Sequence, residues 1–194
     1  MAAMTEPGLH EIVLIRHGET EWSEAGKHTS TTDLPLTKGG RQRALTVASK
    51  LEGREFAAVL VSPLRRAIET CELAGFGDRA EVADDLFEWR YGDDEGRTTD
   101  DIRRDRPGWT VWRDGPQGGE TAEQVRVRVD ALIEQAVNTA GDTLLFAHGH
   151  ILRALAARWI GLEVSDGAHL VLGTATVSRL GYERDTRVIL AWNT

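Results

Sequence analysis

Three short apolar runs divide the chain into segments of alternating character. Residues 11–16 (EIVLIR), 57–62 (AAVLVS) and 142–147 (DTLLFA) are dense in Val, Ile, Leu and other apolar residues, without an alternating polar face. Runs of this kind are typical of parallel strands that are buried on both faces. We therefore predict that these segments form the centre of a parallel sheet.

Longer amphipathic stretches follow or separate these runs. Helical patterns occupy residues 36–53, 62–75, 119–141 and 151–161, and each of them closes at a glycine. In residues 119–141 the apolar positions fall on one helical face: Val125, Val129, Leu132, Ile133 and Ala136. Residues 174–193 alternate across two runs that are joined by charged turn residues, which predicts a pair of strands.

The alternation of buried strands with amphipathic helices predicts the fold class. It is typical of an α/β protein, here a three-layer α/β/α sandwich with a mainly parallel central sheet. The 194 residues suit a single domain over residues 1–194. Residues 96–119 are the least regular part. We expect a short helix around 98–105 there and place this excursion over one edge of the sheet.

Charge and composition exclude several classes of partner. The formal net charge is −8, and the chain therefore lacks the basic face that binds nucleic acids or anionic membranes. No apolar run approaches the ~20 residues of a membrane span, and the first residues do not resemble a signal peptide. The single cysteine, Cys71, excludes an internal disulfide. We expect a cytoplasmic protein, in which any phosphate site is a local basic focus.

Basic or titratable residues follow each of the three predicted strands. The first is followed by Arg16, His17 and Gly18, the second by Arg65 and Arg66, and the third by His148, Gly149 and His150. Because the carboxyl ends of parallel strands meet at one rim of a sheet, we expect these residues to converge. Arginine offers forked donors that match phosphate oxygens, and helix N-termini add N–H groups. The pattern predicts a pocket for a phosphoryl group.

A metal site is the competing interpretation of the same region. His148 and His150 resemble a pair of metal ligands, to which Asp142 and Glu88 would add carboxylates. A metal centre gains little from arginines beside it, and we therefore expect no metal. The sequence has no Walker loop and no G-x-G-x-x-G fingerprint, which argues against nucleotide-dependent chemistry. We expect no cofactor.

Four motifs, in this order, resemble the histidine phosphatase superfamily, also called phosphoglycerate-mutase-like. They are LIRHGET (14–20), SPLRRAIET (62–70), LFEWRYGDDEG (86–96) and LLFAHGHILRALAARWIG (144–161), and they span nearly the whole chain. Within the superfamily, HTSTTDLPLT, GPQGGET and HGHILRALAARW are most similar to bacterial acid phosphatases and fungal sedoheptulose-bisphosphatase-like members. The resemblance implies a phosphoglycerate-mutase-like fold.

The resemblance also implies roles for individual residues. His17 would be the nucleophile that forms a phosphohistidine, and Glu88 would protonate the leaving oxygen and then activate water. The phosphoryl oxygens would be held by Arg16, Arg65 and His148. Further contacts to the substrate would come from Thr20, Ser23, Thr29, Tyr91 and Gly149. Glu95, in the same stretch as Glu88, is expected to face solvent or to cap a turn.

Departures from the mutase pattern favour hydrolysis. Mutase relatives carry asparagine in place of Ser23 and a T-G pair in place of Thr29 and Ser30, and an insertion shields their phosphoenzyme from water. The corresponding stretch here, 96–119, is short. We therefore expect a metal-independent phosphomonoesterase for small phosphate esters, with sugar phosphates as one class. The alternatives are a phosphoglycerate mutase and a non-catalytic module that binds a phosphorylated ligand.

The mouth of the pocket is expected to come from residues 23–33 and 97–119. Aromatic walls or packing would be supplied there by Trp22, Trp89, Trp109 and Trp112. The acidic residues of the region either disfavour highly anionic substrates or form a solvated face: Asp93, Asp94, Asp100 and Asp101. Nothing in the sequence indicates the physiological substrate or the oligomeric state.

Overall fold

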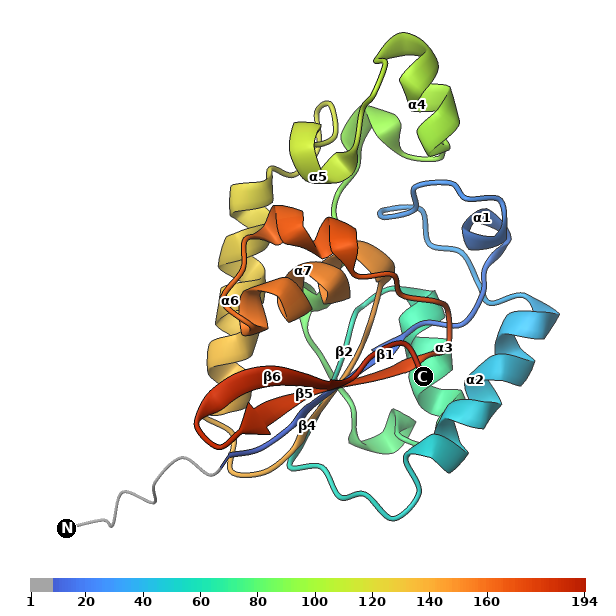
Figure 1. Ribbon diagram of the computed structural model, residues 1–194. Coiled ribbons are helices and arrows are strands. Elements are labelled where there is room, and N and C mark those ends of the chain that lie inside the picture. Colours follow the sequence, from blue (N-terminus) through green and yellow to red (C-terminus); the bar gives the residue numbers. More distant parts are fainter. Residues whose placement is uncertain (1–8) are drawn as a thin grey trace.

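A six-stranded sheet forms the centre of the computed structural model, which describes residues 9–194 (Figure 1). The strand order is β3-β2-β4-β1-β5-β6. The strands β1 (Ile12–Arg16), β2 (Ala58–Val61), β3 (Glu81–Val82) and β4 (Thr143–Ala147) are parallel to one another. Strand β5 (Val177–Glu183) is antiparallel to both of its neighbours, β1 and β6 (Thr186–Ala191). The three predicted central strands and the predicted C-terminal strand pair are confirmed.

The middle strand, β4, is buried along its whole length between β1 and β2. Successive side chains of a strand point to opposite faces, and each strand therefore contributes side chains to two cores, one on each face of the sheet. Leu14 and Leu145 belong to one core, whereas Ile15 and Leu144 belong to the other. Burial on both faces explains why these strands have no alternating polar positions.

Helices cover both faces of the sheet and complete the three predicted layers (Figure 1). On one side, α2 (Lys38–Lys50) and α3 (Arg65–Leu73) bury Val47 and Cys71 against the strands. On the other side lie α6 (Ala122–Val137) and α7 (Gly149–Trp159). The face predicted for α6 is the buried one. The expected fold class, a three-layer α/β/α sandwich with a mainly parallel central sheet, is confirmed.

Short helices lie in the connections. They are α1 (Glu21–Glu24), η1 (Gly77–Arg79), η2 (Asp84–Leu86), η3 (Gly92–Asp94), α4 (Thr99–Asp105), α5 (Val111–Asp114) and η4 (Val164–His169). The helix expected around 98–105 is α4. None of the helices within residues 9–194 is both long and apolar enough to cross a membrane. The start of the chain, where we expect no signal peptide, lies outside the described residues.

The excursion over residues 96–119 does not cover an edge strand, which corrects the expectation from the sequence. Its helices α4 and α5 lie beyond the carboxyl ends of the parallel strands (Figure 1). Two backbone hydrogen bonds hold it there: His28 N donates to Arg97 O at 2.9 Å, and Gly96 N donates to His28 O at 2.8 Å. The excursion is thus joined to the loop that follows β1, beside the expected site.

Substitution of Leu145 by alanine tests the position of the core. The Leu145 side chain is 1% exposed, and its neighbours would only partly fill the space left by Leu145→Ala. We expect the free energy of unfolding to fall by ~2–5 kcal/mol, as measured by urea denaturation. Leu45→Ala is the matched control, because Leu45 on α2 is 48% exposed and its truncation should change stability by less than about 0.5 kcal/mol. Equal losses in the two variants would contradict this placement.

Candidate active site

A cavity of about 250 Å³ opens at the carboxyl ends of β1 and β4. Eight of the ten residues that the sequence predicted for the site line it: Arg16, His17, Thr20, Ser23, Thr29, Glu88, Tyr91 and Gly149. The other two, Arg65 and His148, do not. The topological rule that places ligands at this rim of an α/β sheet therefore located the site.

His17 is buried directly after β1, with its imidazole in a defined tautomer. Its Nδ1 lies 2.6 Å from the carbonyl oxygen of Gly18, which only accepts hydrogen bonds. Nδ1 therefore carries the proton, and Nε2 keeps its lone pair. Burial lowers the pKa of His17 well below its usual value, and the charges of Arg66 and Arg16 lower it further. The imidazole is neutral at neutral pH, with Nε2 free to act as a nucleophile.

The glycine after His17 allows two segments to meet behind the nucleophile. A Cβ on Gly18 would lie 2.7 Å from the carbonyl oxygen of Gly40, on α2. The Gly18 N–H also donates to Thr70 Oγ1, on α3, at 2.9 Å. Close approach of the backbone of α2 thus requires glycine here.

Arg16 brings a positive charge to the cavity wall. One of its Nη1 hydrogens goes to the carbonyl oxygen of Leu172, and its guanidinium packs against Gly149 at the start of α7. Its Nε is buried and has no hydrogen-bond partner in residues 9–194. A buried donor without an acceptor is costly, and an anionic ligand in the cavity would offset that cost.

The arginine of SPLRRA that reaches the site is Arg66 and not Arg65, which corrects the expectation from the sequence. The Arg65 side chain is 56% exposed and pairs with Glu69 at 2.6 Å. Arg66 is fully buried, and its Nε donates to His148 Nδ1 at 3.1 Å. Neighbouring residues of a helix point about 100° apart, and only one of the two arginines can face the sheet. The buried face of α3 consists of Arg66, Ala67, Thr70 and Cys71.

The loop over residues 29–32 holds the Arg66 guanidinium through backbone oxygens. Nη1 donates to Thr32 O at 3.2 Å, and Nη2 donates to Thr29 O at 3.1 Å. Glu95 orders this loop, because its Oε1 accepts the N–H groups of Ser30 and Thr32. Glu95 therefore orders this loop, whereas we had expected it to face solvent or to cap a turn. Within the described chain no carboxylate lies at ion-pair distance from Arg66, and its charge remains available to the site.

His148 is buried behind His17 with both nitrogens engaged. Because Arg66 only donates, Nδ1 of His148 accepts, and Nε2 carries the proton that goes to Ser62 Oγ at 2.6 Å. Burial lowers the pKa of His148 well below its usual value, and so does the charge of Arg66. The two imidazole rings lie 5.1 Å apart. In this arrangement His148 supports Arg66 and packs against the nucleophile, and its contact with a phosphoryl oxygen stays a prediction.

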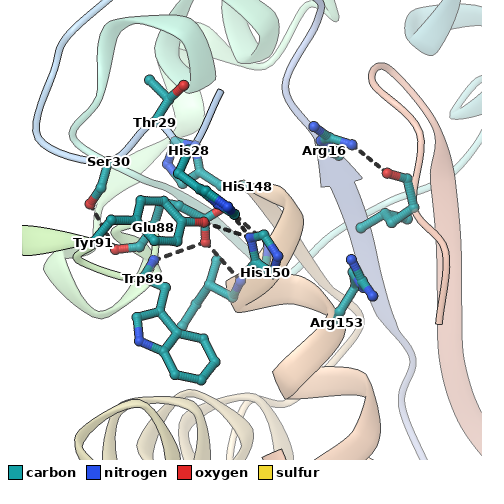
Figure 2. Close-up of polar contacts among 12 residues, drawn as sticks. Arg16, His28, Thr29, Ser30, Glu88, Trp89, Tyr91, His148, His150 and Arg153 are labelled. Carbon is teal, nitrogen blue, oxygen red and sulfur yellow. Dashed lines mark hydrogen bonds and ion pairs between the residues drawn. The ribbon is translucent and has the colours of Figure 1, made fainter. Parts of the chain in front are cut away.

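Glu88 is held by the N-terminus of α7 (Figure 2). Its Oε1 accepts the N–H groups of Trp89 and Ile151, both at 2.9 Å, and its Oε2 accepts that of His150 at 3.0 Å. The first N–H groups of a helix have no partner within it, and a carboxylate satisfies them. Oε1 accepts two of these hydrogen bonds and Oε2 only one. Oε2 is therefore the oxygen with capacity left for a proton.

Thr20 and Ser23 close the start of α1 and also line the cavity. Thr20 Oγ1 accepts the N–H of Ser23 at 3.1 Å, and Ser23 Oγ accepts the N–H of Thr20 at 2.9 Å. This reciprocal pair is a capping box. Thr29 Oγ1 donates to Lys27 O at 3.0 Å. Contacts of these hydroxyl groups with a ligand stay predictions.

Seven residues of the cavity wall were not predicted as site residues, and four of them have basic or imidazole side chains: Lys27, His28, His150 and Arg153. His150 Nδ1 lies 2.5 Å from the hydroxyl of Tyr91 (Figure 2). Burial raises the pKa of Tyr91 well above its usual value and lowers the pKa of His28 and of His150, and all three are therefore neutral. The HGH motif was a signal for His150. No periodicity or spacing points to Lys27 or Arg153.

The wall of the cavity is basic although the protein is acidic. Arg16, Lys27 and Arg153 line it, and among the described residues Glu88 is the single carboxylate of the wall. The chain as a whole carries a formal net charge of −8. The site is thus the local basic focus that the composition required of a phosphate pocket.

The metal site considered from the sequence is not assembled. Asp142 lies at the amino end of β4, where it accepts hydrogen bonds from Glu11 N and Arg54. The length of β4 separates it from His148 by roughly 20 Å. In residues 9–194 no three His, Cys, Asp or Glu side chains are grouped to hold a metal ion.

Comparison with known proteins agrees with this geometry. The profile of the histidine phosphatase superfamily (branch 1) matches residues 12–194. The chain belongs to this superfamily. The acid phosphatase of Mycobacterium tuberculosis is 39% identical over 183 residues, which cover 92% of this chain and 89% of that protein. The resemblance inferred from the four motifs is confirmed.

Two further relatives support the same branch. Sedoheptulose 1,7-bisphosphatase of Saccharomyces cerevisiae is 36% identical over 207 residues, which cover 90% of this chain and 75% of that protein. Among solved structures, the product of an open reading frame of Mycobacterium tuberculosis superposes with a TM-score of 0.91 at 37% identity. The match covers 95% of this chain and 97% of that one.

The roles of the two adjacent arginines differ in a measurable way. Arg66→Gln removes a buried charge from the site and should weaken the binding of inorganic phosphate by about 10- to 100-fold, as measured by isothermal titration calorimetry. Arg65→Gln removes only an exposed ion pair and should change the affinity by less than about threefold. A larger loss in Arg65→Gln than in Arg66→Gln would contradict this assignment. Circular dichroism of both variants checks that each is folded.

Proposed function

We propose that this protein is a metal-independent phosphatase that hydrolyses small phosphate monoesters through a phosphohistidine on His17. The observation that carries the proposal is the tautomer of His17. The Gly18 carbonyl fixes the proton on Nδ1, and Nε2 is therefore unprotonated in a cavity with basic walls. A neutral imidazole nitrogen beside fixed cations is suited to attack a phosphorus atom that carries negative oxygens.

In the first step, Nε2 of His17 attacks phosphorus, the P–N bond forms and the P–O ester bond breaks. The leaving oxygen takes a proton from Oε2 of Glu88, and the product alcohol departs. Phosphorylated imidazole carries a positive charge, which the hydrogen bond from Nδ1 to Gly18 O stabilises. Arg16 and Arg66 stabilise the negative charge on the transferred group.

In the second step, water attacks the phosphohistidine. The Glu88 carboxylate takes a proton from the water, the new P–O bond forms and the P–N bond to His17 breaks. Inorganic phosphate leaves, and both residues return to their starting protonation states. One carboxyl group thus serves as acid and then as base.

The named relatives support a phosphatase that acts on sugar phosphates. Two of them are an acid phosphatase and a sedoheptulose 1,7-bisphosphatase. A third, the glucosyl-3-phosphoglycerate phosphatase of Mycolicibacterium vanbaalenii, is 30% identical over 174 residues, which cover 81% of this chain and 77% of that protein. The proposal treats residues 1–194 as one domain with an excursion at 96–119. It includes a cytoplasmic location, with which the single buried thiol of Cys71 is compatible.

The site favours hydrolysis over the alternative activities. A relative named 2,3-bisphosphoglycerate-dependent phosphoglycerate mutase is 32% identical, less than the acid phosphatase at 39%. The excursion contains only the short helices α4 and α5 and is not the long shielding insertion of a mutase. A module that only binds phosphate has no use for the Glu88 carboxylate beside an anion, because that carboxylate repels the ligand.

Substitution of His17 tests the proposed function. The wild-type protein should release phosphate from p-nitrophenyl phosphate between pH 5 and 7 in the presence of EDTA, and His17→Ala should abolish this activity. Removal of a covalent nucleophile commonly costs about 10⁶-fold in kcat. Activity that EDTA eliminates, or that survives in His17→Ala, would overturn the phosphohistidine route.

The role of Glu88 is tested by the dependence on the leaving group. Glu88→Gln removes the proton that an alkoxide needs, and kcat for fructose 6-phosphate should fall by ~10²–10⁴-fold. The p-nitrophenolate ion leaves without protonation, and the release of p-nitrophenol in the first turnover should fall much less. Glu81→Gln, on the exposed edge strand β3, is the control. Equal losses with the two substrates would show that Glu88 does not act as the acid.

A further inference from the structure

A second cavity, of about 240 Å³, opens beside the catalytic cavity. The two share four wall residues: His28, Thr99, His150 and Arg153. The remaining wall of the second cavity comes from the excursion, through Arg103, Trp109, Thr110, Val111 and Trp112. Pockets for small ligands typically measure about 300–1,000 Å³, a range that neither cavity reaches alone. The two cavities are therefore adjacent, and a ligand that occupied both would lie along these four shared residues.

The second cavity is basic. Arg103 and Arg153 line it, and no Asp or Glu of the described chain does. Three aspartates near this cavity have arginine partners: Asp94 is bound by Arg106, Asp101 by Arg104 and Asp105 by Arg97. Of the four aspartates considered from the sequence, Asp94 and Asp101 are therefore neutralised by neighbouring arginines.

Arg153 is oriented without being neutralised. Its Nε donates to Gly167 O at 3.0 Å, and its Nη2 donates to Ala168 O at 3.1 Å. The guanidinium lies 4.6 Å from the centre of the Trp112 ring. A Cβ on Gly167 would lie 2.6 Å from that ring, and glycine thus lets Trp112 sit against η4. Backbone oxygens and an aromatic face fix the direction of the guanidinium but leave its full charge.

The cost of this arrangement points to an anionic ligand. Burial lowers the pKa of Arg153, and no carboxylate lies at ion-pair distance from it in residues 9–194. A partly buried cation without a counter-ion is unfavourable, and a bound anion offsets this cost. Planar guanidinium groups bind phosphate and carboxylate oxygens in the same forked geometry.

The other walls suit uncharged hydroxyl groups. His28 and His150 are neutral, and each presents an imidazole to both cavities. Thr99 Oγ1 lies 3.3 Å from His28 Nε2. The side chains of Trp109, which is 2% exposed, and Trp112 add apolar atoms to the wall.

We propose that the second cavity binds the leaving group of the substrate, and that this leaving group is a polyhydroxylated chain with a second anionic group, which Arg153 binds. The proposal rests on the proposed function, because it assumes that the scissile phosphoryl group occupies the catalytic cavity beside His17. It narrows the substrate class to phosphate monoesters that carry a distal phosphate or carboxylate.

The test compares substrates that differ in the distal group. Values of kcat/KM are measured for fructose 1,6-bisphosphate, fructose 6-phosphate and 3-phosphoglycerate in the wild type, Arg153→Gln and Arg153→Lys. The matched control is Arg104→Gln, which removes the same charge from an exposed residue of α4. The readout is kcat/KM for each substrate with a second anionic group divided by kcat/KM for fructose 6-phosphate, a ratio that cancels any general effect on the catalytic cavity.

Arg153→Gln should lower at least one of these ratios by about tenfold or more, Arg153→Lys should lower it less, and Arg104→Gln should leave it as in the wild type. A fall confined to 3-phosphoglycerate identifies the distal group as a carboxylate, and a fall confined to fructose 1,6-bisphosphate identifies it as a phosphate. Ratios that are the same in the wild type and Arg153→Gln would overturn the proposal.

A binding measurement separates this proposal from the proposed function. The same three compounds are titrated into His17→Ala, with and without Arg153→Gln, by isothermal titration calorimetry. If the wild type hydrolyses neither these compounds nor p-nitrophenyl phosphate, the proposed function fails, and the ratio of binding affinities decides about the second cavity. If the wild type hydrolyses p-nitrophenyl phosphate but Arg153→Gln leaves the substrate ratios unchanged, the proposed function stands. The second cavity then does not bind the leaving group.

Discussion

The hydrogen bond from Arg66 to His148 is the interaction on which the rest of the site depends. Arg66 is fully buried, and its guanidinium is held by His148 and by backbone oxygens of the 29–32 loop. The charge of Arg66 is therefore not cancelled within the site. It disfavours protonation of both His17 and His148 and, through its Nε donor, fixes the tautomer of His148. Burial, together with the charge of this cation, thus keeps the nucleophile neutral, and the same charge favours an anion in the site.

The fold supplies this arrangement through the turn between β4 and α7. His148 is the last residue before α7, and the next N–H groups of the helix hold Glu88. A parallel strand followed directly by a helix brings a histidine, a close glycine and free N–H groups to one point. The same helix carries Arg153 one turn later, at the border of the second cavity. Catalysis and the proposed recognition of the leaving group are therefore built on one rigid element.

Much of the fold and the position of the site were predictable from local pattern. Strands buried on both faces and a one-sided helix leave a clear periodicity, and the strand ends then fix where residues such as His17 and His148 meet. The choice between Arg65 and Arg66 depended on the rotational position of α3, which the spacing of Ala67 and Cys71 defines and the motif alone did not. The predicted position of the excursion was wrong, because the excursion is held in place by hydrogen bonds to the loop around His28. Contacts between segments so far apart leave no local signal.

The second cavity could not be predicted from local sequence patterns, for the same reason. Its walls come from the loop after β1, the excursion and α7, and its charge depends on which acidic residues are already paired. The sequence shows aspartates at 93, 94, 100 and 101 beside this region. In the structure Asp94 and Asp101 bind Arg106 and Arg104, and the side chains of Arg103 and Arg153 line the cavity. The positions of acidic residues along the chain are therefore a poor guide to the charge of the surface they border.

The central claim is that Nε2 of His17 carries the phosphoryl group during turnover. Its most direct test uses Glu88→Gln with p-nitrophenyl phosphate, because the first step then needs no acid while the second step lacks its base. The protein is quenched in alkali, in which phosphohistidine is stable, and the phosphorylated peptide is identified by mass spectrometry. The account predicts phosphate on His17, bound through Nε2. Phosphate on any other residue, or a burst of p-nitrophenol without phosphate on the protein, would contradict it.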